Sequence, residues 1–136
     1  AQVNDLQYFK LLALAFRYCC AVMIQPRDIQ LDSDAVMAIG QIFGIMSDQI
    51  FSFERNSPWD IEHLFELDQR FAEHVEGVPI PLGIDDVALI IQGMAFTEVM
   101  SADLPWIEMV RWTSDFVTSE LRQYWTEDEW RTFTAG

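Results

Sequence analysis

Two histidines are the side chains in this sequence best suited to binding a metal ion. His63 and His74 are 11 residues apart, so on one helix they would share a face but stand about 16 Å apart along its axis. One metal ion cannot bridge that distance. The Asp60 to His63 spacing matches half of a di-iron carboxylate site, but the second Glu-x-x-His motif that such a site needs is absent from the sequence. We therefore expect two solvated histidines and no metal site.

The cysteines, glycines and paired aspartates do not form a catalytic motif either. Cys19 and Cys20 are adjacent, so they cannot form an ordinary structural disulfide with each other, and neither has a histidine nearby in the sequence. No glycine-rich phosphate loop precedes a helix. Asp85 and Asp86 could suggest catalysis, but acidic residues at the start of a helix are more simply explained by its dipole. The sequence predicts no enzyme, no cofactor and no metal.

The composition indicates one domain over residues 1–136, because the chain has 136 residues, of which 51% are hydrophobic. Eight basic residues against 22 acidic ones give a net charge of −14. Such a field repels nucleic acid and would attract a basic peptide. The simpler interpretation is a solvated acidic surface that keeps an apolar protein soluble. Since neither a membrane span nor a leader sequence is evident, we expect a soluble intracellular protein.

Apolar residues recur every three or four positions over most of the chain, which is the period of one helix face. The last helix is expected to begin with a capping box at residues 126–129. Between the third and fourth helices, Val78–Leu82 is expected to be a stiff extended link. No convincing strand is predicted. The predicted helices span residues 6–24, 34–51, 58–76, 84–100 and 105–125, with a short last one from about residue 127.

Three details of these helices are specific enough to be tested. Gly40 and Gly44 lie inside the second helix at a cost of about 1 kcal/mol each relative to alanine, which predicts close approach of another helix there. Pro58 is expected as the first residue of the third helix, and Gly77 as its end. The helix over residues 84–100 is apolar on nearly every side, which predicts a central helix buried all round. The fold class is all-α, a helical bundle with this apolar central helix surrounded by amphipathic helices.

The order of the predicted helices resembles the Bcl-2 family, and three local patterns carry the resemblance. Val36–Phe43 resembles the BH3 region, with Gln41 where the family usually has aspartate. Gly83–Ala88 falls on the BH1 region, although its tryptophan and arginine are missing. Trp125–Trp130 resembles the BH2 region, and Trp112 stands where the preceding helix often carries a tryptophan.

The resemblance implies an inhibitor of apoptosis that sequesters BH3 helices of pro-death proteins in a hydrophobic groove. Short, divergent members are typical of viral homologues, which would act in the host cytoplasm or at the mitochondrial outer membrane. A groove lined by phenylalanines exposes apolar surface, so a homodimer is also predicted. The residues implied for the groove are Phe43, Ser47, Ile50, Phe51, Leu67, Phe71, Asp85, Asp86, Val87, Ala88 and Ile91.

Other interpretations of the same residues stay open. Phe43, Phe71 and Ile91 could equally belong to the protein's own core. The fold could serve without a BH3 groove, as in poxviral Bcl-2-like proteins that block innate immune signalling through a helix face. The missing BH1 arginine is compatible with that alternative. An unrelated helical bundle and an acidic mimic of DNA are further alternatives, although the high apolar content disfavours the mimic.

Overall fold

The computed structural model describes residues 26–49 and 58–134, so the helix predicted over residues 6–24 lies outside the described residues. The described chain is mostly helical, with one small sheet. Its elements are β1 (Arg27–Ile29), α2 (Ser33–Gln49), α3 (Ile61–Ala72), β2 (Ile80–Leu82), α4 (Ile84–Met100), α5 (Ile107–Arg122) and α6 (Glu127–Thr134).

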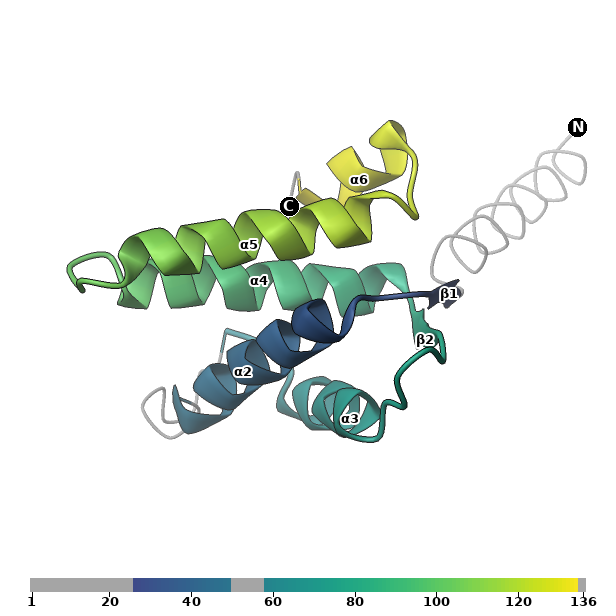
Figure 1. The fold of residues 1–136 in the computed structure, drawn as a ribbon, viewed down its shortest axis with the longest axis horizontal. Coiled ribbons are helices and arrows are strands. Elements are labelled where there is room, and N and C mark those ends of the chain that lie inside the picture. The colour runs from purple at the N-terminus through teal and green to yellow at the C-terminus, as the bar shows by residue number, and fades with distance from the viewer. Residues whose placement is uncertain (1–25, 50–57, 135–136) are drawn as a thin grey trace, which may run out of the picture.

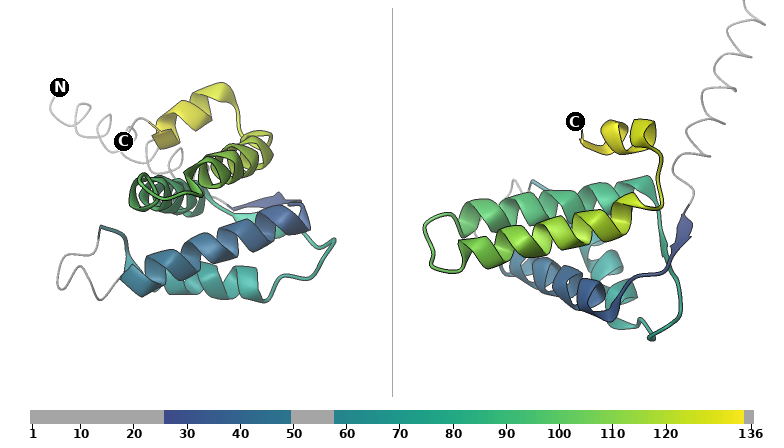
Figure 2. Two further views of the ribbon diagram at one scale, coloured as in Figure 1. Left: turned by 60° about the vertical axis from the view of Figure 1, so that its left-hand side comes forward. Right: turned by 45° about the horizontal axis from the view of Figure 1, so that its top comes forward.

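Helix α4 lies at the centre of the bundle, as predicted. Helices α2 and α3 form one layer, α4 and α5 form a second, and α6 lies against the outer side of the α4–α5 pair (Figures 1 and 2). Helix α2 contacts α3, α4 and α5, while α4 contacts α5 and α6 as well. None of the helices in the described residues is long and apolar enough to span a membrane.

The two strands correct the all-α prediction. β1 and β2 pair antiparallel, with Arg27 opposite Leu82 and Ile29 opposite Ile80. Ile29, Ile80 and Leu82 are buried in the core, whereas Pro81 is exposed between them. This alternation is that of a short strand with one buried face, so residues 80–82 are part of a sheet and not a free extended link.

Helix α2 begins as predicted, because the Asp32 carboxylate accepts the backbone N–H of Asp34 at 2.8 Å. The predicted close approach at Gly40 and Gly44 is wrong, since a methyl group added at either would meet no atom within 4 Å. The close contact occurs at Gly93 of α4 instead. A methyl group there would lie 2.7 Å from Ile42 Cγ2. The glycine that permits two helices to approach is therefore on α4 and not on α2.

Helix α3 is shorter than predicted at both ends. It starts at Ile61 and not at Pro58, because Asp60 is its N-cap and accepts the backbone N–H of His63 at 3.2 Å. It ends at Ala72, so His74 lies beyond the helix. Gly77 is not the helix end but part of a later turn, where its φ of +84° requires the freedom of glycine.

Helix α4 has the predicted bounds, but it is not buried all round. Its buried apolar residues include Val87, Ile90 and Met94, whereas Val99 and Met100 in its last turn are exposed. Helix α5 begins two residues after Pro105, with Trp106 as its N-cap. The predicted capping box before α6 is confirmed: Thr126 N–H donates to Glu129 at 2.9 Å, and Glu129 N–H donates to the Thr126 hydroxyl at 3.2 Å.

Candidate functional site

The described phenylalanines and aliphatic residues predicted for the groove lie mostly inside the protein. Phe43, Leu67, Phe71 and Val87 are all buried in the core. Phe43 and Phe71 pack edge to face, with ring centroids 5.4 Å apart. These side chains pack against one another inside the protein, so a ligand could contact them only if α2 and α3 moved apart.

The remaining predicted groove residues are less buried or lie outside the described residues. Ala88 and Ile91 are half-buried, and Ile91 packs against the core. Asp85 is exposed. Ile50 and Phe51 fall outside the described residues. Among the described residues, the buried Oγ of Ser47 has no hydrogen-bond partner. The homodimer was predicted from exposure of Phe43, Phe51 and Phe71, and burial of the two described rings removes that argument for it.

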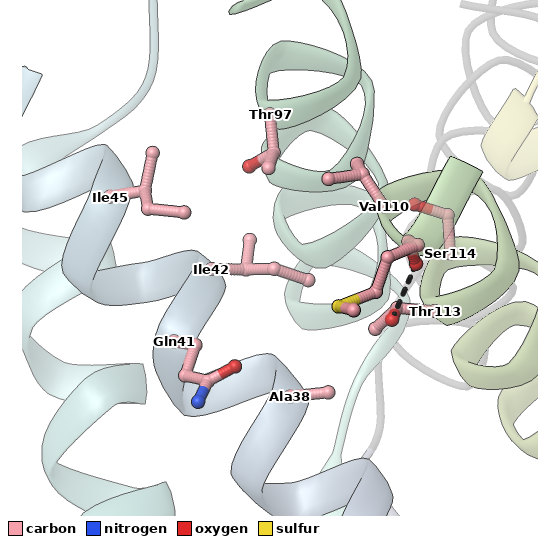
Figure 3. Close-up of a pocket in the computed structure, with 9 residues that line it drawn as sticks. Ala38, Gln41, Ile42, Ile45, Thr97, Val110, Thr113 and Ser114 are labelled. Carbon is pink, nitrogen blue, oxygen red and sulfur yellow. Dashed lines mark hydrogen bonds between the residues drawn. The ribbon is translucent and has the colours of Figure 1, made fainter. Parts of the chain in front are cut away.

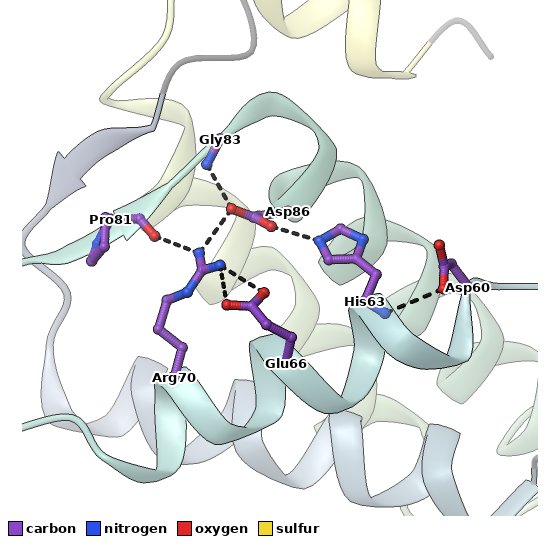
Figure 4. A network of polar contacts seen from close by, with 7 residues as sticks. All are labelled: Asp60, His63, Glu66, Arg70, Pro81, Gly83 and Asp86. Carbon is purple, nitrogen blue, oxygen red and sulfur yellow. Dashed lines mark hydrogen bonds and ion pairs between the residues drawn. The ribbon is translucent and has the colours of Figure 1, made fainter.

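Asp86 is the centre of a polar network that joins α3 to the start of α4 (Figure 4). Its carboxylate accepts hydrogen bonds from Gly83 N–H at 2.8 Å and from Arg70 Nη1 at 2.9 Å. It also lies 2.6 Å from His63 Nε2. Arg70 in turn pairs with Glu66 on the same helix. His63 is thus a partner of a buried carboxylate, and the prediction of two solvated histidines is wrong for it.

These contacts explain why the carboxyl group of Asp86 is deprotonated. Burial by itself would raise the pKa of this carboxyl group, but hydrogen bonds from Gly83, His63 and Arg70 outweigh it, so the pKa of Asp86 is lowered. Asp86 is therefore a charged carboxylate that holds two helices together. A general acid would need the opposite shift.

His63, Asp85 and Asp86 also form the sort of cluster that could bind a metal ion. One ligand atom from each lies within 4.8 Å of the others. However, Arg70 already supplies a positive charge to the Asp86 carboxylate at 2.9 Å. A divalent cation at Asp86 would have to compete with this guanidinium and would be repelled by it. The donor set therefore fits an ion-pair network better than a metal site.

The segment that resembles BH2 has a structural role. Arg27 of β1 pairs with Glu129, donates to the Tyr124 carbonyl at 2.7 Å, and lies 5.5 Å from the ring centroid of Trp125. The hydrogen bond from Arg27 is the main reason that the pKa of Glu129 is lowered. Trp125 and Trp130 are both buried against the core. These contacts fix α6 to the small sheet.

The accessible apolar site lies between α2 and α5, and we call it the α2–α5 groove. It consists of two adjoining hollows that share Ala38, Gln41 and Thr113. Figure 3 shows side chains of α2, α4 and α5 directed into one of them. The groove is lined by Asp32, Asp34, Met37, Ala38, Gln41, Ile42 and Ile45, by Thr97, and by Met109, Val110, Trp112, Thr113, Ser114 and Phe116.

Large apolar side chains are unusually exposed along this groove. Met37 on α2 is 63% exposed, and Met109 and Trp112 on α5 are each 68% exposed. Trp112 stacks on Phe116 with ring centroids 5.7 Å apart. Such a concentration of exposed apolar area is typical of an interaction surface. The charged residues that line the groove, Asp32 and Asp34, are both acidic.

The polar groups of the groove are not arranged for catalysis. The hydroxyl of Thr97 donates to the Gly93 carbonyl at 2.8 Å, and that of Thr113 donates to the Met109 carbonyl at 2.8 Å. Both hydroxyl groups are therefore used within their own helices. The lining residues include no histidine or cysteine that could activate a nucleophile. The groove is suited to binding.

Sequence reasoning missed the α2–α5 groove, although a signal for it was present. Met37 and Ile45 lie away from the side of α2 that carries the buried Ile39 and Phe43. Met109 and Trp112 fall on a common side of α5. Each helix therefore carries a second group of apolar residues outside the core. Periodicity identifies such groups on single helices, but only the tertiary fold shows that the two groups lie side by side.

Comparisons with protein-family models, with curated proteins and with solved structures found no match for this chain. The Bcl-2 family therefore stands as a resemblance drawn from sequence patterns and helix order.

Proposed function

We propose that this protein is a binding module that takes up an amphipathic α-helix of basic character along the α2–α5 groove. It would act by holding one ligand helix per protein chain, without catalysing a reaction. A BH3 helix of a pro-apoptotic protein, the ligand implied by the sequence resemblance, is one member of this ligand class. The observation that carries the proposal is the exposed row of Met37, Met109 and Trp112 beside the hollows of the groove.

The shape of the groove supports a helical ligand. Its walls are two helices that contact each other. Met37, Gln41 and Ile45 follow each other every four residues along one wall. A third helix laid over two packed helices can place residues at i, i+3, i+4 and i+7 between them. Side chains of a ligand helix would thus meet Ile42 and Val110 at the floor.

Charge supports a basic partner. The chain has a net charge of −14, and Asp32 and Asp34 lie at the end of the groove nearest to Trp112 and Phe116. Lysine or arginine residues on the ligand would be attracted to this end. An arginine there could also lie over the exposed ring of Trp112.

The apolar area exposed in the groove is sufficient for a ligand to bind with moderate affinity. Burying a large apolar side chain completely is worth about 1.5–3 kcal/mol, so three residues that are about two-thirds exposed gain roughly 1–2 kcal/mol each. The ligand's own anchors gain similar amounts. After the cost of association, a dissociation constant near 1 μM, or roughly 8 kcal/mol, is within reach.

A second candidate function uses the same surface differently: a flat helix-face contact with a signalling protein, without uptake of a helix. It is favoured by the exposure of Trp106 at the start of α5, which extends the apolar surface past the lining residues of the groove. In that case a folded partner would bind, but isolated helices would not.

Calorimetric titration against a panel of helical peptides tests the proposal. The panel should contain BH3-type peptides, basic amphipathic helices, and versions of each in which glutamate replaces lysine and arginine. We expect at least one basic peptide to bind at about 1 μM and its acidic version to bind at least tenfold more weakly. Failure of every peptide at about 100 μM would exclude helix uptake and favour the flat contact.

A further inference from the structure

We propose that the hollow between the first turn of α2 and the middle of α5 is an arginine subsite, and that it selects arginine over lysine at one end of a ligand helix. The residues of this hollow that carry the argument are Asp32, Asp34, Met37, Trp112 and Phe116, and we call it the Trp112 subsite. The inference rests on the proposed function for its place within a helix-binding groove, but recognition of a guanidinium group by the subsite does not require a helix.

Trp112 supplies an accessible aromatic wall to the subsite. Its indole ring stacks on Phe116, with ring centroids 5.7 Å apart and an angle of 6° between the planes. Phe116 is half-buried and packs against the core, so it supports the indole ring from one side. Because Trp112 itself is mostly exposed, a ligand can reach the rest of the ring. The face of an indole ring attracts cations, and arginine more often than lysine.

The two aspartates of the subsite have no basic partner among the described residues. One oxygen of the Asp32 carboxylate accepts the backbone N–H of Asp34 at 2.8 Å, which leaves its other oxygen available. Asp34 is exposed in the first turn of α2. The arginines of the described residues pair with other carboxylates; they are Arg27, Arg70, Arg111, Arg122 and Arg131. The subsite therefore presents two negative charges to an arginine from a partner.

A guanidinium group can contact both walls of the subsite at once, whereas an ammonium group cannot. The guanidinium group is planar, so its face can stack on an aromatic ring while its N–H groups donate in the plane to a carboxylate. It is also more weakly hydrated than an ammonium group, so its transfer from water into a partly apolar hollow costs less. The exposed side chain of Met37 lines the same hollow and would cover the aliphatic part of the arginine.

The second hollow of the groove gives the ligand a direction. Ile42, Ile45 and Val110 line it (Figure 3), and none of its described lining residues is charged. Asp34 and Ile45 are 11 residues apart, which corresponds to about 16 Å along α2. A ligand helix that places apolar anchors in the second hollow therefore needs its arginine about three turns from the farthest anchor, at the end that lies over Trp112.

Nuclear magnetic resonance of the full chain tests the subsite without a helix. The probes are the capped tripeptides Gly-Arg-Gly and Gly-Lys-Gly, which carry the same charge and are too short to form a helix. The readout is the indole N–H resonance of Trp112, identified by its loss in Trp112→Phe. Each probe is titrated at constant ionic strength into the native protein, Asp34→Asn and Asp85→Asn. Asp85→Asn is the matched control, because it removes the same charge from an exposed residue outside the groove.

We expect the arginine tripeptide to shift the Trp112 resonance with a dissociation constant of about 10 mM. The lysine tripeptide should bind about threefold more weakly. Asp34→Asn should weaken binding of the arginine tripeptide about threefold, while Asp85→Asn leaves it unchanged. The inference would be overturned if neither tripeptide shifted the resonance, if both bound equally, or if Asp34→Asn had no larger effect than Asp85→Asn.

The helical peptides used to test the proposed function complete the experiment. In the tightest of them, replacing arginine with lysine should weaken binding to the native protein about threefold, and should have a smaller effect on binding to Asp34→Asn. Selectivity between the tripeptides without binding of any helix would disprove only the proposed function. Binding of helices with no preference for arginine over lysine would disprove only this inference.

Discussion

Arg70 on α3 donates a 2.9 Å hydrogen bond to Asp86 in the first turn of α4, and so ties the N-terminal end of the central helix to its neighbour. The same carboxylate accepts the N–H of Gly83 at 2.8 Å. Only 6% of the Asp86 side chain is exposed. This one carboxylate therefore both caps α4 and joins two helices.

Replacing Asp86 with asparagine should destabilise the fold by about 2–4 kcal/mol, because it removes the charge from a buried, fully hydrogen-bonded ion pair. Asp85→Asn is the matched control, since this neighbour is exposed and should cost less than about 0.5 kcal/mol. Urea unfolding followed by circular dichroism measures both free energies. Equal effects of the two variants would mean that the network does not contribute to stability.

The stability of the protein should fall in acid, in part through Asp86. The pKa of Asp86 is lowered in the fold by hydrogen bonds that outweigh its burial, so its contribution is present above its unfolded pKa of about 4. That contribution is lost as the pH falls through the lower, folded-state pKa. The difference in unfolding free energy between the native protein and Asp86→Asn should shrink below about pH 4, and a constant difference from pH 7 to pH 2.5 would contradict this.

Gly93→Ala should destabilise the protein by about 1–3 kcal/mol. The added methyl group would lie 2.5 Å from Met46 Sδ and 2.7 Å from Ile42 Cγ2. The thioether can move aside, but the β-branched, buried Ile42 has little freedom. Gly44→Ala is the control and should stabilise by about 0.5–1 kcal/mol, because nothing lies within 4 Å of its added methyl. Thermal unfolding of the pair should show melting temperatures shifted in opposite directions.

The parts of the fold that could be predicted from sequence are those governed by local signals. The bounds of α4 and the capping box at Thr126 follow from residues within four positions of each other. The sheet could not be predicted, since it joins three-residue strands that start at Arg27 and Ile80, far apart in the chain. The start of α3 was predicted at Pro58, but Asp60 is the N-cap in the structure, so the helix begins three residues later, at Ile61.

Prediction of the binding site was limited because the sequence does not show which apolar stripe of a helix faces the core and which stays exposed. Helix α2 carries two such stripes, and periodicity does not reveal that Ile39 and Phe43 turn to the core while Met37 and Ile45 stay exposed. Phe43 and Phe71 were assigned to a groove with core burial as the open alternative, and they are buried. Only the packing of α2 against α3, α4 and α5 separates these roles.

The central claim, that a helix binds between α2 and α5, is tested most directly by comparing two exposed aromatic residues. Trp112 lines the groove, whereas Phe65 is an exposed residue of α3 outside it. Using the tightest peptide of the panel, calorimetry should show that Trp112→Glu weakens binding at least tenfold, which is about 1.4 kcal/mol, while Phe65→Glu changes the affinity less than twofold. Both variants should keep the native melting temperature within a few degrees, because both side chains are exposed. If Phe65→Glu abolished binding and Trp112→Glu left it unchanged, the ligand would bind on the α3 side, and the account given for the α2–α5 groove would be wrong.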